Sequence, residues 1–134
     1  MREMSFTKGQ EVLLVMIEDG NAFRHTRTTK PNYTFDDMIV PATVKSANKK
    51  YITVYPTAYG QNTRITYKFE VEENYRERSN YSAEYELYDT YENAKNTYDA
   101  RKLYAKLRDS FYRTNKDTYT KEQLEAVVKI LGIE

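Results

Sequence analysis

NYSAEYELYDTYE, residues 80–92, is the stretch that decides the fold, because it ends a β-rich half of the chain and begins a helical half. Ala83, Tyr85 and Leu87 alternate with Glu84, Glu86 and Tyr88. That period of two is typical of a strand with one buried face. The stretch therefore predicts a last strand that leads directly into a helix.

The helix that follows is predicted over about 91–113. Asp89 or Thr90 can be its N-cap, because a short side-chain oxygen accepts the free N–H groups of a first helical turn. If Asp89 is the cap, Glu92 falls at N3 and completes a capping box. One face of the helix is apolar at Ala100, Leu103, Tyr104, Leu107 and Phe111.

A second face of this helix, roughly opposite the first, is formed by Tyr91, Ala94, Tyr98 and Ala105. We expect one of the two faces to pack on the β half. The other face then meets a second helix or stays free for a partner. Tyr91 and Tyr98 are the candidate partner-facing residues.

The second helix has both start and stop signals. Thr120 as N-cap and Gln123 at N3 form a capping box, and Tyr119 and Leu124 suit a hydrophobic staple. Gly132 suits the left-handed position that ends many helices. Apolar residues at helical spacing are Leu124, Val127, Val128 and Leu131.

Four further strands are predicted before the decisive stretch, at 12–17, 38–44, 51–55 and 63–71. Pro41 lacks an N–H group and therefore marks a sheet edge or a bulge. The fourth strand should bury one face, made of Ile65, Tyr67, Phe69 and Val71. Residues 72–80 are predicted to be a charged linker without regular structure.

We therefore expect an α+β fold, in which a small five-stranded antiparallel β-barrel of the Src-homology-3-like type precedes a C-terminal helical hairpin that packs on it. The barrel is assigned to residues 1–88 and the hairpin to 89–134, as one compact unit. A long loop is expected at 18–37, where periodicity vanishes. Loops of this length in a small domain are usually functional or disordered.

Composition excludes several classes of chemistry. The 134 residues contain no cysteine, which removes disulfides and cysteine-ligated zinc. The apolar run at 12–17 is far shorter than the roughly 20 residues of a membrane-spanning helix. We expect a soluble protein of the bacterial cytoplasm.

Catalytic and metal-binding motifs are also missing from the sequence. His25 is the single histidine, and no acid lies at a spacing that would orient it as a base. The four glycines are scattered, so no phosphate loop is predicted. No spacing matches a calcium loop or a zinc helix motif. We expect neither an enzyme nor a cofactor.

Charge is segregated along the chain despite a net charge of +1. Residues 21–68 contain eight Lys/Arg and two Asp, or +6, whereas residues 69–99 contain three Lys/Arg and nine acids, or −6. Such asymmetry can steer a charged partner, or the two blocks can neutralise each other internally. The 14 tyrosines, with no tryptophan, suit both a thin core and an interface.

Two binding functions fit these features. Cations neutralise phosphates while aromatic rings stack on bases, so nucleic acid is one candidate ligand. Its candidate surface is Arg24, Arg27, Lys30, Lys45, Lys49, Lys50, Arg64 and Lys68, with Tyr33, Tyr51, Tyr55, Tyr59 and Tyr67 interleaved. A host protein or ribonucleoprotein is the other candidate partner, with the 18–37 loop, His25 included, as the best candidate site.

The order of three signals resembles the small barrel proteins of phages and mobile elements of Gram-positive gut bacteria. The signals are Lys-Gly-Gln-Glu-Val at 8–12, Tyr-x-x-x-Tyr-x-Leu-Tyr-x-Thr at 81–90, and the pair Leu-Arg-x-x-Phe at 107–111 and Tyr-Thr-x-Glu-Gln-Leu at 119–124. The resemblance covers the last 55 residues well and the barrel loosely.

The resemblance implies a phage accessory protein that binds and inhibits a host nucleic-acid-handling or defence complex, as anti-CRISPR proteins do. A nucleic-acid-binding module that uses the basic, Tyr-rich barrel face is the first alternative. A protein that binds or sequesters a small ligand such as a nucleotide is the second.

Overall fold

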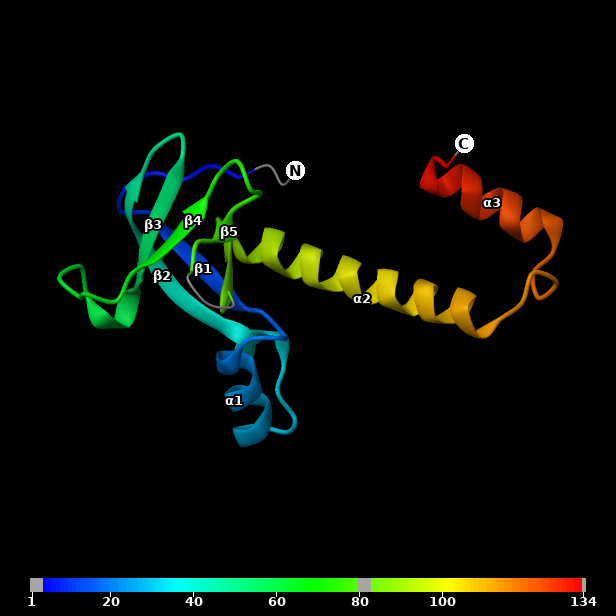
Figure 1. Cartoon of the computed structure of the whole chain (residues 1–134), viewed down its shortest axis with the longest axis horizontal. Helices are drawn as coiled ribbons and strands as arrows, with labels where there is room; N and C mark the ends of the chain where they lie inside the picture. Colours follow the sequence, from blue (N-terminus) through cyan, green and yellow to red (C-terminus); the bar gives the residue numbers. More distant parts are fainter. Residues whose placement is uncertain (1–3, 80–82, 134) are drawn as a thin grey trace. The chain divides into compact units, whose positions relative to one another are not determined.

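The computed structural model describes residues 4–79 and 83–133 (Figure 1). It contains a closed antiparallel barrel in which the strands neighbour one another in chain order. The strands are β1 (Glu11–Met16), β2 (Ile39–Ala47), β3 (Tyr51–Pro56), β4 (Tyr67–Glu70), β5 (Arg76–Glu77) and β6 (Tyr85–Tyr88). The helices are α1 (Asn21–Thr29), α2 (Tyr91–Arg113) and α3 (Lys121–Leu131), with 3₁₀ turns η1 (Phe35–Met38) and η2 (Thr57–Tyr59).

The predicted α+β class and barrel are confirmed, but the barrel has six strands rather than five. The additional strand, β5, lies inside the segment that was predicted to be a charged linker. Two residues cannot show a periodicity, so no sequence pattern could reveal β5. It pairs with both β4 and β6 and thereby closes the barrel.

The fourth strand is shorter than predicted. It begins at Tyr67 instead of residue 63, and Ile65, expected on its buried face, is 48% exposed. Pro41 lies within β2 and pairs with Leu13. The register between β2 and β3 begins only at Ala42, so β2 is locally unpaired on that side at Pro41. The missing N–H group is tolerated there.

The core of the barrel is formed by inward residues of all the longer strands. Leu14 of β1 and Leu87 of β6 face each other in register, and neither is exposed. Val54 and Phe69 are likewise fully buried on β3 and β4. The seam between the first and last strands is therefore closed by apolar packing as well as by hydrogen bonds.

The 18–37 segment is not a long loop, because it contains α1 and η1 (Figure 1). Gly20 precedes α1 and has no side chain to cap it. The cap comes instead from Glu84, whose carboxylate accepts the backbone N–H groups of Asn21 at 3.2 Å and Ala22 at 2.9 Å. A cap supplied from 62 residues away leaves no local signal, which is why the sequence did not predict this helix.

Replacing Glu84 with alanine is expected to destabilise α1 and to lower the free energy of unfolding by about 1 kcal/mol, the usual value of a lost cap. Urea unfolding measures the free energy, and amide hydrogen exchange should show faster exchange in α1 than in β3. The matched control is Glu72→Ala, at an exposed position in the β4–β5 turn. Equal losses in both variants would contradict the assigned cap.

The two C-terminal helices begin and end close to their predicted limits. Thr90, rather than Asp89, caps α2, since its hydroxyl accepts the N–H of Asn93 at 3.1 Å. Of the two predicted caps Thr90 is confirmed, and the capping box with Glu92, which required Asp89 as the cap, does not apply. In α3 the capping box of Thr120 and Gln123 is present, and Gly132 adopts the left-handed conformation with φ 67°.

Contacts divide the chain into two units, residues 1–97 and 98–134. The first contains the barrel, α1 and the first turns of α2, and the second contains the rest of α2 and all of α3. Within the described ranges, no helix is both long enough and apolar enough to cross a membrane.

Candidate functional site

Three cations surround the ring of Tyr51 at one end of the barrel. The Lys68 ammonium lies 4.9 Å from the ring centroid, the Lys50 ammonium 5.3 Å and the Arg78 guanidinium 5.4 Å. Arg78 also donates a hydrogen bond of 2.5 Å to the Tyr51 hydroxyl. We call these four residues the Tyr51 cluster.

The barrel fixes the position of each member of the Tyr51 cluster. Lys50 and Tyr51 follow a tight turn in which the Asn48 side chain accepts both of their backbone N–H groups, at 2.9 and 2.8 Å. Lys68 is on the outer face of β4, opposite Thr53 of β3. Arg78 follows β5, and its N–H donates to the Lys68 carbonyl at 2.7 Å.

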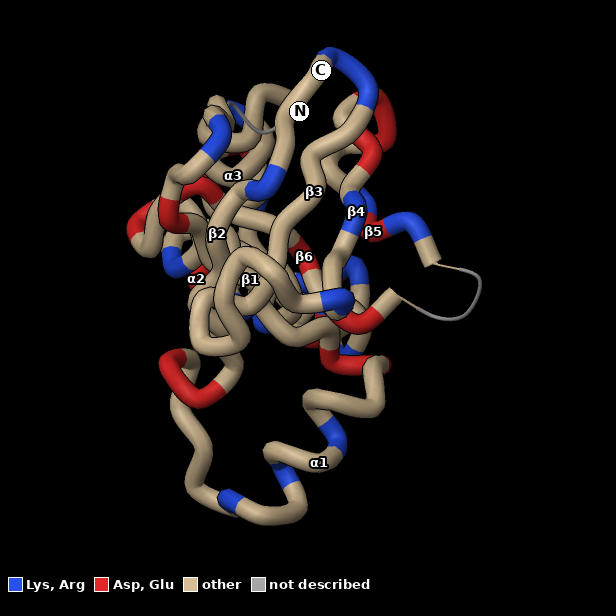
Figure 2. Tube along the Cα trace, turned by 90° about the vertical axis from the view of Figure 1, so that its left-hand side faces the viewer, with Lys and Arg blue, Asp and Glu red and all other residues tan. Residues whose placement is uncertain are grey.

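Among residues 4–79 and 83–133, no carboxylate forms an ion pair with a member of the Tyr51 cluster. In the described part of the chain, no carboxylate lies within 4.0 Å of the charged nitrogens of Lys50, Lys68 or Arg78. Figure 2 shows Lys and Arg at the β2–β3 turn and on β4, with acids on the neighbouring β4–β5 turn. The acids of this turn, Glu72 and Glu73, and Glu70 at the end of β4 reduce the positive potential without pairing with the cluster.

The Tyr51 cluster suits an anion. Cation–π attraction to one ring holds the three positive groups together, while the nearby glutamates weaken their mutual repulsion without pairing with any of them among the described residues. An anionic oxygen that binds between them would relieve that repulsion. Because cations already occupy the ring, Tyr51 is unsuited to stack on a base.

The cations predicted in the 18–37 segment are separate from this cluster. Arg24, His25 and Arg27 are exposed on α1, which projects from the barrel (Figure 1). Lys30 pairs with Asp37 at 3.1 Å, and the Thr34 N–H and Lys30 together lower the pKa of that carboxyl.

Aromatic packing engages two more residues near α1. Tyr33, predicted to bind a partner, packs edge-to-face on Phe23 with ring centroids 5.3 Å apart. The Arg27 guanidinium lies 5.8 Å from the centroid of the Phe23 ring, so Phe23 packs against both Tyr33 and Arg27.

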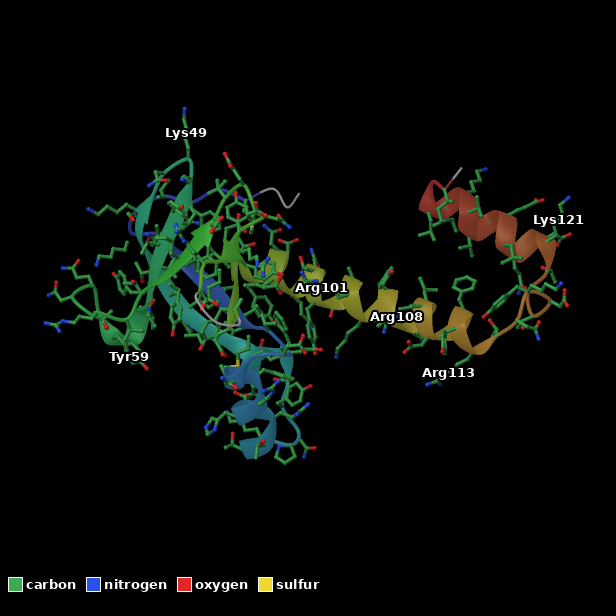
Figure 3. All side chains as sticks on the ribbon, in the orientation of Figure 1. Lys49, Tyr59, Arg101, Arg108, Arg113 and Lys121 are labelled. Carbon is green, nitrogen blue, oxygen red and sulfur yellow. The ribbon has the colours of Figure 1, made fainter. Side chains whose placement is uncertain are left out.

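The remaining predicted residues lie elsewhere on the barrel. Lys49 is at the tip of the β2–β3 turn, and Figure 3 shows it at the opposite end of the barrel from Tyr59. Arg64 is exposed in the segment before β4, and Tyr55 is half-buried on β3. The structure therefore brings Lys50 and Lys68 together with Tyr51 but does not gather the whole predicted surface.

A small aromatic cleft of about 220 Å³ lies at the Tyr59 end. It is lined by Val40, Pro41, Pro56, Ala58, Tyr59, Tyr67 and Tyr85. The rings of Tyr67 and Tyr85 meet edge-to-face at 5.1 Å. Burial, followed by electrostatic repulsion from the Tyr67 hydroxyl and the Glu84 carboxylate, raises the pKa of Tyr85 to about 12.

Alkaline pH should destabilise the barrel through Tyr85. Its folded pKa of about 12 exceeds the ordinary value of 10.0, so stability is complete below pH 10 and falls as pH rises toward 12. Between pH 8 and 11 the raised pKa of Tyr85 should lower the free energy of unfolding by roughly 1 kcal/mol. The loss is smaller than the full pKa shift implies because the side chain is partly exposed. Urea unfolding of Tyr85→Phe should lack that loss. Tyr112→Phe, at an exposed position, should retain it, and a Tyr85→Phe variant with wild-type pH dependence would contradict the assignment.

The two candidate partner-facing residues on α2 have neighbours in the structure. Tyr91 donates to Asp36 at 2.8 Å and packs on Phe35, so it joins the start of α2 to η1. Tyr98 is half-buried, with the Lys102 ammonium 4.5 Å from its ring centroid.

Arg78 is the functional candidate that sequence reasoning missed. It lies in the segment counted as acidic, and the two-residue strand β5 that positions it shows no pattern. Only pairing between β4 and β5 brings Arg78 beside Lys68. Among the residues that the structure describes, no group of three or more acidic or histidine side chains could hold a metal ion.

Comparison with known proteins shows the family of this chain. A family model described as the phage ProQ C-terminal-like domain matches residues 1–134. No curated protein and no solved structure matches the chain.

Proposed function

We propose that this chain, which belongs to the phage ProQ C-terminal-like domain family, is a non-enzymatic phage-associated protein that binds nucleic acid through the Tyr51 cluster. The ligand group is the phosphate backbone. The observation that supports this proposal is the convergence of Lys50, Lys68 and Arg78 on one ring, with no ion-paired carboxylate in the part of the chain that the structure describes.

The chemistry of the cluster favours phosphate over base contacts. Two ammonium groups act as point charges, and a guanidinium presents a planar fork that matches phosphate oxygens. Phosphate contacts fix the position of a protein on nucleic acid but do not read its sequence. This proposal replaces the expectation that the barrel tyrosines stack on bases, since Tyr51 instead holds the cations in place.

Fluorescently labelled oligonucleotides of equal length and unrelated sequence test this function. At about 50 mM salt, where backbone contacts are strong, we expect all of them to bind with Kd values that agree within a few fold. Absence of binding would overturn the proposal. Binding to one sequence only would overturn the assignment to the backbone.

Inhibition of a host nucleic-acid-handling or defence complex is the second candidate function. It is favoured by α1, which projects from the barrel with Arg24, His25 and Arg27 exposed and is anchored by Glu84. A pull-down from host lysate should then capture a protein complex with the wild-type chain and lose it with Arg24→Ala/Arg27→Ala. Capture that is unchanged in this variant would count against α1 as the binding element.

A further inference from the structure

Residues 98–133 form a helical unit without a core. None of the described residues in this range is buried. Six large apolar side chains are 37% to 62% exposed, namely Leu103, Leu107, Phe111, Leu124, Val128 and Leu131. Helix α3 has 11 residues, and helices shorter than about 12–15 residues are marginal in water unless an apolar face is packed. The unit therefore needs a surface that covers these side chains.

The connection between α2 and α3 is ordered by its own contacts. The Ser110 and Tyr119 hydroxyls are 2.7 Å apart, and the rings of Phe111 and Tyr119 are 5.6 Å apart. The Thr118 hydroxyl accepts the N–H of Asn115 at 3.1 Å. These contacts fix the end of α2 against the start of α3 and leave the six apolar side chains exposed.

We propose that a second copy of this chain covers these faces, and that α2 and α3 form the interface of a symmetric dimer. A two-fold axis can place α3 of one copy on α2 of the other, so that each apolar face meets an apolar face. Each copy offers on the order of 600 Å² of apolar side chain, close to the roughly 800 Å² per partner of a standard interface. The polar rim supplies the difference.

The distribution of charge also suits a second copy. By helical spacing, the cations of α2 from residue 98 onward lie beside or behind the face formed by Leu103, Leu107 and Phe111, namely Lys106 and Arg108 beside it and Arg101, Lys102 and Arg113 behind it. Figure 3 shows Arg113 pointing away from α3. Contact between the apolar faces therefore does not bring these cations together. The interface needs no partner of opposite charge, because α3 contains two lysines and two glutamates.

The oligomeric state of the full chain tests this proposal. Sedimentation equilibrium over a concentration series should give a mass that approaches twice 15.9 kDa. Leu107→Glu should shift the chain to the monomer mass, because a carboxylate would enter the interface. Lys102→Glu, which makes the control charge change about 140° around the helix from Leu107, should leave the dimer mass unchanged.

Two results would overturn the proposal. The first is a wild-type chain that remains monomeric at hundreds of micromolar. The second is a Leu107→Glu variant that is folded by circular dichroism and still has the dimer mass. If Leu107→Glu fails to fold, Leu131→Glu near the C-terminus applies the same test to α3. A wild-type chain that stays monomeric and binds a different protein through this face would likewise overturn the proposal.

Discussion

Replacing Lys50 and Lys68 with alanine is expected to weaken oligonucleotide binding by about 10- to 100-fold at roughly 0.1 M salt. Each phosphate contact releases a counterion from the nucleic acid, and this release raises the affinity by almost a factor of ten at that salt concentration. The gain disappears when the contact is lost. Both ammonium groups lie about 5 Å from the centroid of the Tyr51 ring, so the variant removes two of the three cations of the Tyr51 cluster. Fluorescence anisotropy against one labelled duplex measures the change.

The matched control is Arg24→Ala/Arg27→Ala, which removes the same charge from the exposed surface of α1. It lowers the net charge equally but leaves the Tyr51 cluster intact. We expect its affinity to change by no more than a few fold. An equal loss in both variants would mean that net charge, rather than the cluster, determines binding.

Leu87→Ala is expected to lower the free energy of unfolding by about 2–5 kcal/mol, the usual cost of truncating a buried leucine. Leu87 is fully buried on β6 and faces Leu14 across the seam that closes the barrel. Small domains are stable by only about 5–15 kcal/mol, so the loss is a large part of the total. Urea unfolding of the full chain measures it.

Ile65→Ala is the control, because the structure and the sequence pattern disagree on whether this side chain is buried. The alternation at 63–71 places Ile65 on a buried strand face, whereas the structure leaves it 48% exposed before β4 begins. We expect a loss below about 1 kcal/mol, in line with a partly exposed site. A loss as large as that of Leu87→Ala would mean that the strand extends over Ile65.

The parts of the fold that carry their own local signals could be predicted from sequence. The capping box at Thr120 and Gln123 and the left-handed Gly132 are determined by residues within a few positions of one another, and the structure contains both. The alternation of β3 is also local, with Ile52 and Val54 buried between half-buried neighbours.

The parts that depend on distant residues could not be predicted. Helix α1 is capped by Glu84, and β5 exists because β4 and β6 pair with it on either side. Neither feature leaves a trace in its own stretch of sequence. The same distinction applies to the candidate site. Lys50 and Lys68 belong to strands and turns with a sequence pattern and could be predicted, whereas Arg78 is positioned by β5 and could not.

The most direct test of the proposed function is the salt dependence of wild-type binding to duplex DNA. Three phosphate contacts predict a plot of log affinity against log salt concentration with a slope of about −2.7, since each contact contributes about −0.9. The Lys50→Ala/Lys68→Ala variant should then show a slope near −1. A wild-type slope close to zero, or one that the variant leaves unchanged, would contradict the assignment of phosphate binding to the Tyr51 cluster.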